Sequence, residues 1–311
     1  MTGVTVTIGI PTYNRADGYL SEALSAALAQ TYPNIEVIVA DNCSTDDTQR
    51  VVTAIGGDRV TYIRHETNLG AQGNYNSLVE RATGEYFLML HDDDRIDADF
   101  VATCVAAMGE LRPGLVRTGT RVIDGSGQVV YSRLNRAPGT TTKALLEAWF
   151  DTKTSFYFCS TLFNTAALRR TGGFATPKAL FNDVAAYVLV ADDAGTVEVQ
   201  DVKATFRQHA SNTGKASTVA AWAHDAAHVV DLMTKTVSRG AAEPDKEFRA
   251  KATSYFCRNC YHRAARLLDP AARREAFAAV QAALDCTAAP WQYQMGRLRT
   301  RLGSRVKSLL K

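Results

Sequence analysis

Short apolar runs alternate with amphipathic stretches along the first hundred residues. Strands are predicted at residues 4–10, 35–40, 60–64 and 86–90, of which 35–40 and 86–90 are apolar runs, and patterns typical of helices lie between them at about 21–30, 44–55 and 74–82. A strand that is apolar throughout is usually covered on both faces, as in a parallel sheet between two layers of helices. The alternation therefore predicts an α/β fold with a doubly wound, mostly parallel sheet.

The pattern becomes less regular after residue 100. Further elements are expected as a helix at about 98–111, a hairpin at 119–131, a strand at 156–163, a helix at 180–191 and an extended segment at 196–206. Beyond Gly214 the chain is rich in alanine and is predicted to be helical to its end. The predicted organisation is a first domain at 1–214, with halves at 1–100 and 101–214, and a helical C-terminal region at 215–311.

The composition excludes several classes of protein. Apolar residues make up 46% of the 311 residues and charged residues 22%, which allows a packed core and excludes a disordered chain. The formal net charge of +3 gives no reason to expect nucleic acid as a partner. The sequence shows neither a run of eighteen apolar residues nor a secretory signal, so we expect a cytoplasmic protein. The six cysteines are accordingly expected to be free thiols, with Cys257 and Cys260 packed within a helix.

Residues 291–311 form a basic segment with an amphipathic pattern. They contain six Lys and Arg residues and no acid. The apolar side chains recur at steps of three and four, at Trp291, Met295, Leu298, Leu302, Val306 and Leu309. Such a helix either lies on an anionic membrane surface or packs against the protein or a second subunit, and the sequence leaves both alternatives open.

Four polar residues, His91-Asp92-Asp93-Asp94, directly follow the apolar run at 86–90. Adjacent carboxylates repel each other unless a cation or solvent compensates their charge. Because the preceding run is predicted to be a buried strand, these carboxylates lie at the carboxyl end of a strand, where α/β sheets bind their ligands. Hard oxygen donors of this kind suit Mg²⁺ or Mn²⁺. The alternative is an acidic turn that only faces solvent.

Two further polar segments are predicted at the same edge of the sheet. Residues 41–46 (DNCSTD) follow the run at 35–40, and residues 11–15 (PTYNR) follow the run at 4–10. The first segment offers carboxylates, although Asp41 alone could be a helix cap. The second offers an aromatic ring and a cation. Three polar loops at one edge of a sheet indicate a shared binding site.

Five segments, taken in order, resemble the family 2 glycosyltransferases of GT-A fold. They are residues 10–15 (IPTYNR), 39–46 (VADNCSTD), 68–70 (NLG), 83–86 (TGEY) and 91–94 (HDDD). Each motif is weak alone, but their order and spacing match the family, and the resemblance covers about residues 4–214. It implies an inverting transferase with a Rossmann-like GT-A domain that uses a nucleotide-diphosphate sugar and a divalent cation.

The resemblance also implies roles for individual residues. Asp93 and Asp94 match the acidic metal motif of the family, and His209 is a further candidate ligand. Asp183 follows a Gly-Gly-Phe segment as the family's base does, so it is the implied base that takes the proton of the acceptor hydroxyl. Its alternative role is a helix cap. The residues implied to line the nucleotide pocket are Pro11, Thr12, Tyr13, Arg15, Asp41, Asn42, Asn68, Asp92 and Asp93.

Three positions depart from the family pattern. Asn42 stands where many relatives have Asp, and its amide can donate as well as accept, so uridine is not fixed as the nucleoside. His91 also replaces an Asp, and Asn182 replaces the usual Glu before Asp183. The resemblance favours UDP or dTDP as the sugar carrier, with GDP as an alternative. It implies a saccharide or lipid-linked acceptor in cell-envelope or extracellular polysaccharide synthesis, at the inner face of the plasma membrane if the basic segment binds lipid. An oligomer is compatible with the sequence.

Three other functions fit parts of the sequence. A non-catalytic protein that binds a nucleotide sugar on the same fold would be compatible with Asn42 and Asn182. A zinc hydrolase would use His224 and His228, which are spaced for one helical face, but the general-base Glu of the metalloprotease helix is absent. A dinucleotide-dependent oxidoreductase is disfavoured because no GxGxxG follows the first strand.

Overall fold

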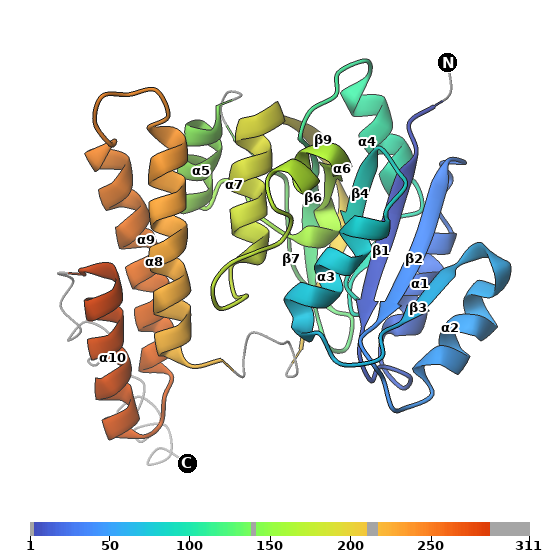
Figure 1. Cartoon of the computed structure of the whole chain (residues 1–311), viewed down its shortest axis with the longest axis horizontal. Helices are drawn as coiled ribbons and strands as arrows, with labels where there is room; N and C mark the ends of the chain where they lie inside the picture. The colour runs from blue at the N-terminus through green and yellow to red at the C-terminus, as the bar shows by residue number, and fades with distance from the viewer. Residues whose placement is uncertain (1–2, 138–140, 210–216, 287–311) are drawn as a thin grey trace, which may run out of the picture. The chain divides into compact units, whose positions relative to one another are not determined.

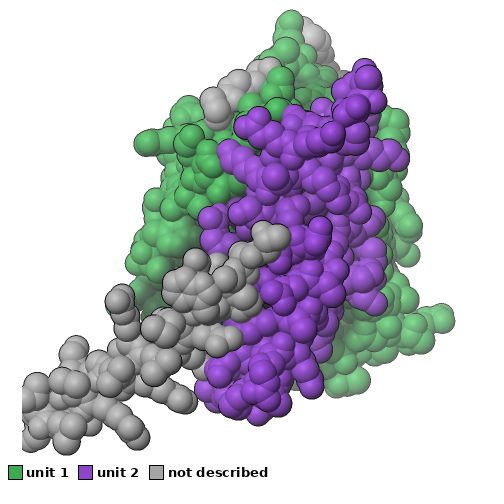
Figure 2. Space-filling view, turned by 90° about the vertical axis from the view of Figure 1, so that its left-hand side faces the viewer, with its two compact units in different colours: residues 1–175, 182–212 green, residues 176–181, 213–311 purple. Residues whose placement is uncertain are grey.

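The chain forms two compact units in the computed structural model, which describes residues 3–137, 141–209 and 217–286 (Figure 1). The first unit comprises residues 1–175 and 182–212, and the second comprises residues 176–181 and 213–311 (Figure 2). The short segment 176–181 therefore belongs to the second unit, although the chain on both sides of it belongs to the first.

The first unit begins with a parallel sheet and its helices. β1 pairs with β2 on one side and with β4 on the other, and β3 extends the sheet beyond β2, all in parallel. The bounds are β1 Val6–Thr12, α1 Leu20–Leu28, β2 Ile35–Asp41, α2 Thr48–Gly56, η1 Gly57–Arg59, β3 Thr61–Arg64, α3 Gly70–Arg81 and β4 Tyr86–Met89. Because these strands run in the same direction, the chain leaves each of them at the same edge of the sheet. The register places Thr12 beside Asp41 at that edge.

The rest of the first unit makes the sheet mixed. The strand order is β3-β2-β1-β4-β8-β6-β9-β5, and β7 pairs with β6 off this path. β8 runs antiparallel to both β4 and β6, whereas β9 runs parallel to β6. The bounds are β5 Arg95–Ile96, α4 Phe100–Met108, β6 Leu115–Asp124, β7 Val129–Arg133, α5 Thr142–Phe150, η2 Phe158–Ser160, β8 Thr161–Asn164, α6 Thr165–Arg170, α7 Asn182–Ala194 and β9 Thr196–Gln208. β8 is nearly as buried as β4, so its apolar pattern does not reveal its direction.

The core of the first unit is centred on β1 and β4. Every residue of these two strands is buried, as their apolar runs predict. Leu20 and Leu24 of α1 and Phe100 of α4 pack in the same apolar cluster as β1. Gly9 of β1 permits a close approach of Phe87, because a Cβ at that position would lie 2.7 Å from the ring. The core thereby fixes the strands whose ends carry the polar loops.

The described part of the second unit consists of helices. Their bounds are α8 Val219–Val237, α9 Lys246–Ala265 and α10 Pro270–Leu284. Each begins at a side-chain cap, because Thr218, Asp245 and Asp269 accept a hydrogen bond from the backbone N–H three residues further on. Cys257 in α9 and Cys286 after α10 form a disulfide. The prediction of six free thiols is therefore wrong, because the packing of α9 against α10 brings together two cysteines that the sequence spaces 29 residues apart.

Most predicted elements are present, with ends that differ by a few residues. The strand predicted at 156–163 is shorter, because residues 158–160 form the 3₁₀ turn η2 and β8 begins at Thr161. α3 begins at Gly70 rather than near residue 74. No helix in the described ranges combines the length and apolarity needed to cross a bilayer. The basic segment at 291–311 lies outside the described residues.

Candidate functional site

The loops after β1, β2 and β4 are bonded to one another at the edge of the sheet. Thr12 Oγ1, at the end of β1, donates to Asp92 Oδ2 after β4 at 2.8 Å. Arg15 Nε lies 3.7 Å from the same carboxylate oxygen. Asn14 Oδ1 accepts from the backbone N–H of Thr45 in the loop after β2 at 2.8 Å. The structure thus brings together the three polar loops that the sequence places at one edge.

Two buried side chains fix the loop after β2. One oxygen of Asp41 accepts from a backbone N–H three residues further on, and the other accepts from the Tyr62 hydroxyl at 2.5 Å. Asn42 Nδ2 donates to Asn68 Oδ1 at 2.9 Å, and its Oδ1 accepts from the backbone N–H of Leu69 at 2.8 Å. Asn42 and Asn68, both implied to bind the nucleotide, therefore bond to each other and hold the loops after β2 and β3 together.

The side chains at this edge of the sheet differ in how far they are exposed to solvent. Pro11, Thr12 and Asp41 are buried, and Arg15 is half-buried. Tyr13 is 45% exposed. An exposed aromatic ring beside a cation can stack on the base of a nucleotide while the cation meets its phosphates.

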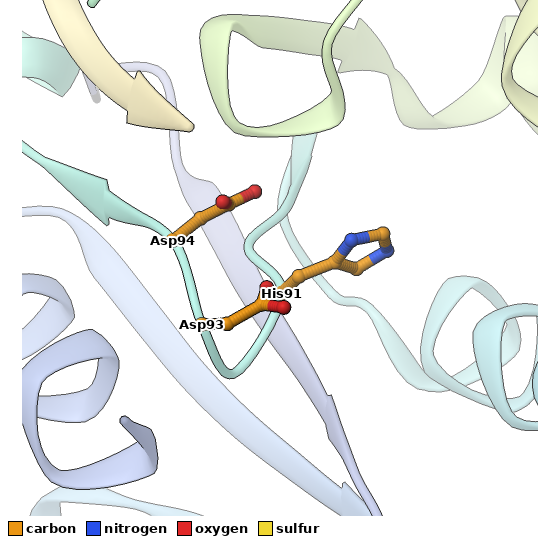
Figure 3. Close-up of side chains that lie close together, drawn as sticks. All are labelled: His91, Asp93 and Asp94. Atoms are coloured by element: carbon orange, nitrogen blue, oxygen red, sulfur yellow. The ribbon is translucent and has the colours of Figure 1, made fainter. Parts of the chain in front are cut away.

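The residues after β4 form an acidic turn, residues 91–94 (Figure 3). His91, Asp93 and Asp94 each offer one ligand atom, and these atoms lie within 4.8 Å of one another. The Nε2 atom of His91 is buried and has no hydrogen-bond partner among the residues described. Two carboxylates and an imidazole are a donor set that Mn²⁺ or Mg²⁺ accepts. In the sequence His91 is only a departure from the family pattern, whereas the geometry makes it a candidate ligand beside Asp93 and Asp94.

Burial and crowding change the acidity of this turn. Burial, followed by the charge of Asp93, raises the pKa of Asp92 to about 7. The same two causes raise the pKa of Asp94 well above its ordinary value. Burial lowers the pKa of His91, so its imidazole stays neutral at physiological pH, which is the form that binds metals. Negative charge is thus costly at this turn, and a cation there would relieve the cost.

Residues at the end of β9 and directly after it contact Asp93 and Asp94 of the acidic turn. The backbone N–H of Arg207 donates to Asp94 Oδ1 at 3.0 Å, and its Nε donates to the backbone carbonyl of Asp93 at 3.1 Å. The buried guanidinium also lies 2.6 Å from Glu22 of α1. His209 Nε2 lies 2.7 Å from Asp93 Oδ2. His209 therefore reaches the turn through Asp93, and Arg207 supports the turn through its backbone and side chain.

Asp183 and Tyr75 complete the surroundings of the turn. Asp183 is half-buried in the first turn of α7, and burial raises its pKa to about 6. Burial raises the pKa of Tyr75 of α3, and the charges of Asp92, Asp93, Asp183 and Asp94 raise it further. Its ring stacks on His91, with 5.3 Å between centroids, and meets Phe158 edge-on. The sequence alone does not single out Tyr75, since one aromatic residue on an amphipathic helix usually packs in the core.

The sequence profile described as Glycosyl transferase family 2 matches residues 7–172, just over half of the chain. This chain belongs to glycosyl transferase family 2. The matched region contains the three polar loops and the acidic turn of this family 2 protein. It ends before Asp183 and His209, so their roles depend on geometry and on the resemblance rather than on the match.

Curated relatives match the chain over part of its length. The putative colanic acid biosynthesis glycosyl transferase WcaA of Escherichia coli (strain K12) is 38% identical over 91 residues, 29% of this chain and 32% of the relative. The succinoglycan biosynthesis protein ExoO of Rhizobium meliloti (strain 1021) is 31% identical over 147 residues, 46% of this chain and 42% of the relative. The matched regions thus span less than half of these relatives.

Solved structures resemble the chain over most of its length. Staphylococcus aureus TarS 1–349 in complex with UDP-GlcNAc has a TM-score of 0.59 at 16% identity, covering 94% of this chain and 92% of that chain. The mannosyltransferase PcManGT from Pyrobaculum calidifontis, in complex with GDP-Man and Mn²⁺, has a TM-score of 0.56 at 21% identity, covering 96% and 81%. At sequence identities of 16% and 21%, the structural similarity establishes the fold and no more. The predicted α/β fold of GT-A type with C-terminal helices is confirmed.

The two histidines that are spaced for a zinc hydrolase do not converge on a metal site. His224 and His228 are exposed on α8, and Asp225 between them is buried. Over the ranges that the structure describes, the acidic turn supplies the only group of three potential ligands whose atoms lie this close together. The structure therefore gives the zinc hydrolase alternative no support.

Proposed function

We propose that this protein is an inverting glycosyltransferase that moves a sugar from a nucleotide-diphosphate donor to an acceptor hydroxyl with the help of a divalent cation. The observation that carries the proposal is the acidic turn, which is bonded to the loop after β1 and offers three potential ligand atoms within 4.8 Å of one another. Family membership supports the transferase class. Two neighbours in fold are described with a nucleotide sugar, UDP-GlcNAc in one and GDP-Man in the other, which supports the donor class.

The loops after β1 and β2 are the proposed binding site of the nucleotide. Tyr13 is exposed for stacking on the base, and Arg15 is close enough to the acidic turn to meet the diphosphate. Asp41 is fixed by the Tyr62 hydroxyl and by a backbone N–H, and its carboxylate would accept a hydrogen bond from a ribose hydroxyl. The proposed nucleotide-binding residues are Pro11, Thr12, Tyr13, Arg15, Asp41, Asn42, Asn68, Asp92 and Asp93.

Asp93 and Asp94 are proposed to hold Mn²⁺ or Mg²⁺, with His91 and His209 as further ligands. The fit is supported by the potential ligand atoms of His91, Asp93 and Asp94, which lie within 4.8 Å of one another, and by the raised pKa of Asp94. When bound, the ion would stabilise the negative charge that develops on the departing diphosphate. Arg207 keeps the turn in place through its bonds to Asp93 and Asp94.

Asp183 is the proposed base. The acceptor hydroxyl loses its proton while its oxygen attacks the anomeric carbon, and Asp183 would accept that proton. A pKa of about 6 leaves the carboxylate mostly ionised at neutral pH and makes it a stronger base than an ordinary aspartate. Attack from the face opposite the leaving diphosphate inverts the anomeric centre.

The proposed acceptor is a saccharide or a lipid-linked saccharide. This extends to the chain the polysaccharide syntheses named for two relatives, those of colanic acid and succinoglycan. The basic segment at 291–311 would hold the enzyme at the anionic inner face of the plasma membrane. Its alternative role is packing against the protein itself or against a second subunit.

A thermal-unfolding panel tests the proposal. The protein is heated with Mn²⁺, with UDP, dTDP or GDP, and with each pair, because a ligand that binds only the folded state raises the midpoint. We expect one diphosphate to stabilise the protein only when Mn²⁺ is present. Asp94→Asn should remove this effect, and Asp47→Asn, which alters an exposed acid of the α2 cap, should keep it.

Product release then separates catalysis from binding. Nucleoside diphosphate set free from UDP-GlcNAc, UDP-glucose or GDP-mannose reports hydrolysis of the donor, with water in place of the acceptor. Metal-dependent binding without release from any donor would favour the non-catalytic nucleotide-sugar binding protein. Absence of stabilisation by every diphosphate would overturn the proposed function.

A further inference from the structure

β7 is an exposed strand that carries apolar side chains. All five of its residues are exposed, whereas its partner strand β6 is mostly buried. Val129 and Val130 are 59% and 57% exposed, and Tyr131 is 40% exposed. Successive side chains of a strand point to opposite faces, so apolar groups reach solvent on both faces of β7. An exposed apolar stretch of this kind typically marks an interaction surface.

The chain around β7 is cationic. Residues 125–146 contain three Lys and Arg residues and no acid. Arg133 and Arg136 are both exposed. The segment at 151–153, to which Arg133 donates a hydrogen bond, contains one acid and one base that pair with each other at 3.5 Å. The apolar strand is therefore flanked by positive charge that its neighbours do not cancel.

The turn between β6 and β7 lies at the edge of the sheet that carries the acidic turn. Because β8 runs antiparallel to both β4 and β6, these two strands end at the same edge. The Tyr19 hydroxyl donates to the backbone carbonyl of Gly125, in the turn before β7, at 2.9 Å. The ring of Tyr19 also lies 5.5 Å from that of His209, centroid to centroid, and His209 contacts Asp93. The exposed strand therefore begins beside the residues proposed to hold the donor.

We propose that β7 docks the first unit on an anionic lipid bilayer. Val129, Val130 and Tyr131 reach the boundary between headgroups and acyl chains, where valine and tyrosine side chains are favourably placed. Arg133 and Arg136 meet the lipid phosphates. The outer backbone edge of β7 stays in the hydrated headgroup region, because an open sheet edge does not enter hydrocarbon.

The contact requires no transfer reaction, so the inference stands apart from the proposed function. Where both hold, the donor site lies at the membrane surface, and a lipid-linked saccharide is favoured over a free one as acceptor.

A second copy of the chain is the other occupant that suits an edge strand. Within the described ranges β7 pairs with β6 and with no further strand. Pairing of β7 with itself across a two-fold axis would bring the same cations of both copies into one interface. The charge around β7 therefore favours the bilayer, and self-association is an outcome of the test.

Binding of the full-length protein to vesicles tests the proposal. Vesicles of phosphatidylcholine mixed with an equal amount of phosphatidylglycerol are compared by co-sedimentation with vesicles of phosphatidylcholine alone. Val130→Asp replaces an exposed apolar side chain by an acid. Leu111→Asp is the matched control, since Leu111 is 64% exposed and precedes β6, at the opposite end of that strand. A double variant, Arg133→Gln with Arg136→Gln, removes both cations.

We expect the wild-type protein to bind the anionic vesicles and Val130→Asp to weaken this binding by about tenfold or more, because it removes apolar burial and adds repulsion. The double arginine variant should weaken binding by about ten- to thirtyfold. Leu111→Asp should stay within about threefold of the wild-type protein, since a distant charge is screened.

Amide hydrogen exchange locates the contact. Anionic vesicles should slow the exchange of residues 129–133 in the wild-type protein and leave that of α2 unchanged. This measurement distinguishes β7 from the basic segment at 291–311, which is proposed to bind the same kind of surface. Should Val130→Asp fail to fold, the double arginine variant and the exchange measurement give the same decision.

Several outcomes would overturn the proposal. Absence of vesicle binding, or exchange at 129–133 that vesicles leave unchanged, would remove β7 from the membrane contact. Equal binding to phosphatidylcholine alone would contradict an anionic surface. Slower exchange that depends on protein concentration and not on vesicles would assign β7 to a second copy. The thermal-unfolding panel decides the proposed function separately: a protein that no diphosphate stabilises but that binds vesicles through β7 would keep this inference and lose the proposed function.

Discussion

Replacement of Asp183 by Asn should make the protein more stable and inactive at the same time. Burial raises the pKa of this half-buried carboxyl from an ordinary value of 3.8 to about 6. The folded protein therefore binds the proton more tightly than the unfolded chain does. The resulting stabilisation is fully present below about pH 4 and is lost as the pH rises through about 6. The base position is thus kept at a cost in stability at neutral pH.

The size of the effect follows from the change in pKa. Each pKa unit corresponds to about 1.4 kcal/mol, so a change of about two units lowers the free energy of unfolding by about 3 kcal/mol between pH 4 and pH 7. Part of the Asp183 carboxylate reaches solvent, which reduces this figure to about 2 kcal/mol. An Asn amide has a similar volume and no charge. Asp183→Asn should therefore gain about 2 kcal/mol over the wild-type protein at pH 8 and almost nothing at pH 4.

Urea unfolding at pH 4 and pH 8, without metal or nucleotide, measures this difference. Asp192→Asn is the control, since this residue lies in the same helix about 14 Å along its axis from Asp183. Wild-type kcat/KM for donor hydrolysis should fall about tenfold per pH unit below about pH 6, because a protonated base cannot accept a proton. A gain in stability that is equal at both pH values, or no gain at pH 8, would refute the assignment of the raised pKa to burial of Asp183.

Three further predictions concern the metal site, its support and the second unit. Asp94→Asn should lower donor turnover by about a hundredfold or more at saturating nucleotide sugar, with a rise in the Mn²⁺ concentration needed for half activity; unchanged Mn²⁺ dependence would remove Asp94 from the ligands. Arg207→Met should lower the free energy of unfolding in urea by about 2–4 kcal/mol, because the guanidinium that pairs with Glu22 is buried. Arg95→Met breaks a pair with Glu22 at the surface and should lower it by about 1 kcal/mol or less. Equal losses in the two variants would contradict this prediction. Replacing Cys257 and Cys286 together by Ser should lower the stability of the oxidised protein by about 3–4 kcal/mol, as a closed loop of 29 residues predicts, and detection of six reactive thiols in the unfolded wild-type protein would show that the bond does not form.

The sequence predicts well what depends on strand periodicity. Apolar runs locate β1, β2, β3 and β4, and parallel strands end at one edge, so the meeting of the three polar loops could be foreseen. Contacts that depend on packing could not be foreseen. The stack of Tyr75 on His91 joins a helix to a loop, and the bonds of Asp225 join a helix to the chain 44 to 49 residues earlier. A buried aspartate between exposed histidines has the same appearance in the sequence as a surface aspartate.

Order of synthesis has a consequence for the acidic turn. Arg207 follows Asp94 by 113 residues, and β9, which carries Arg207, also pairs with β5 directly after the turn. At a translation rate of about 5–20 residues per second, the ribosome needs roughly 6 to 23 s to make this stretch. During that time the four parallel strands can assemble, and Thr12 and Arg15 can reach Asp92. This edge of the sheet can therefore form before Arg207 is made, and during that interval divalent cations of the surrounding solution can neutralise its carboxylates.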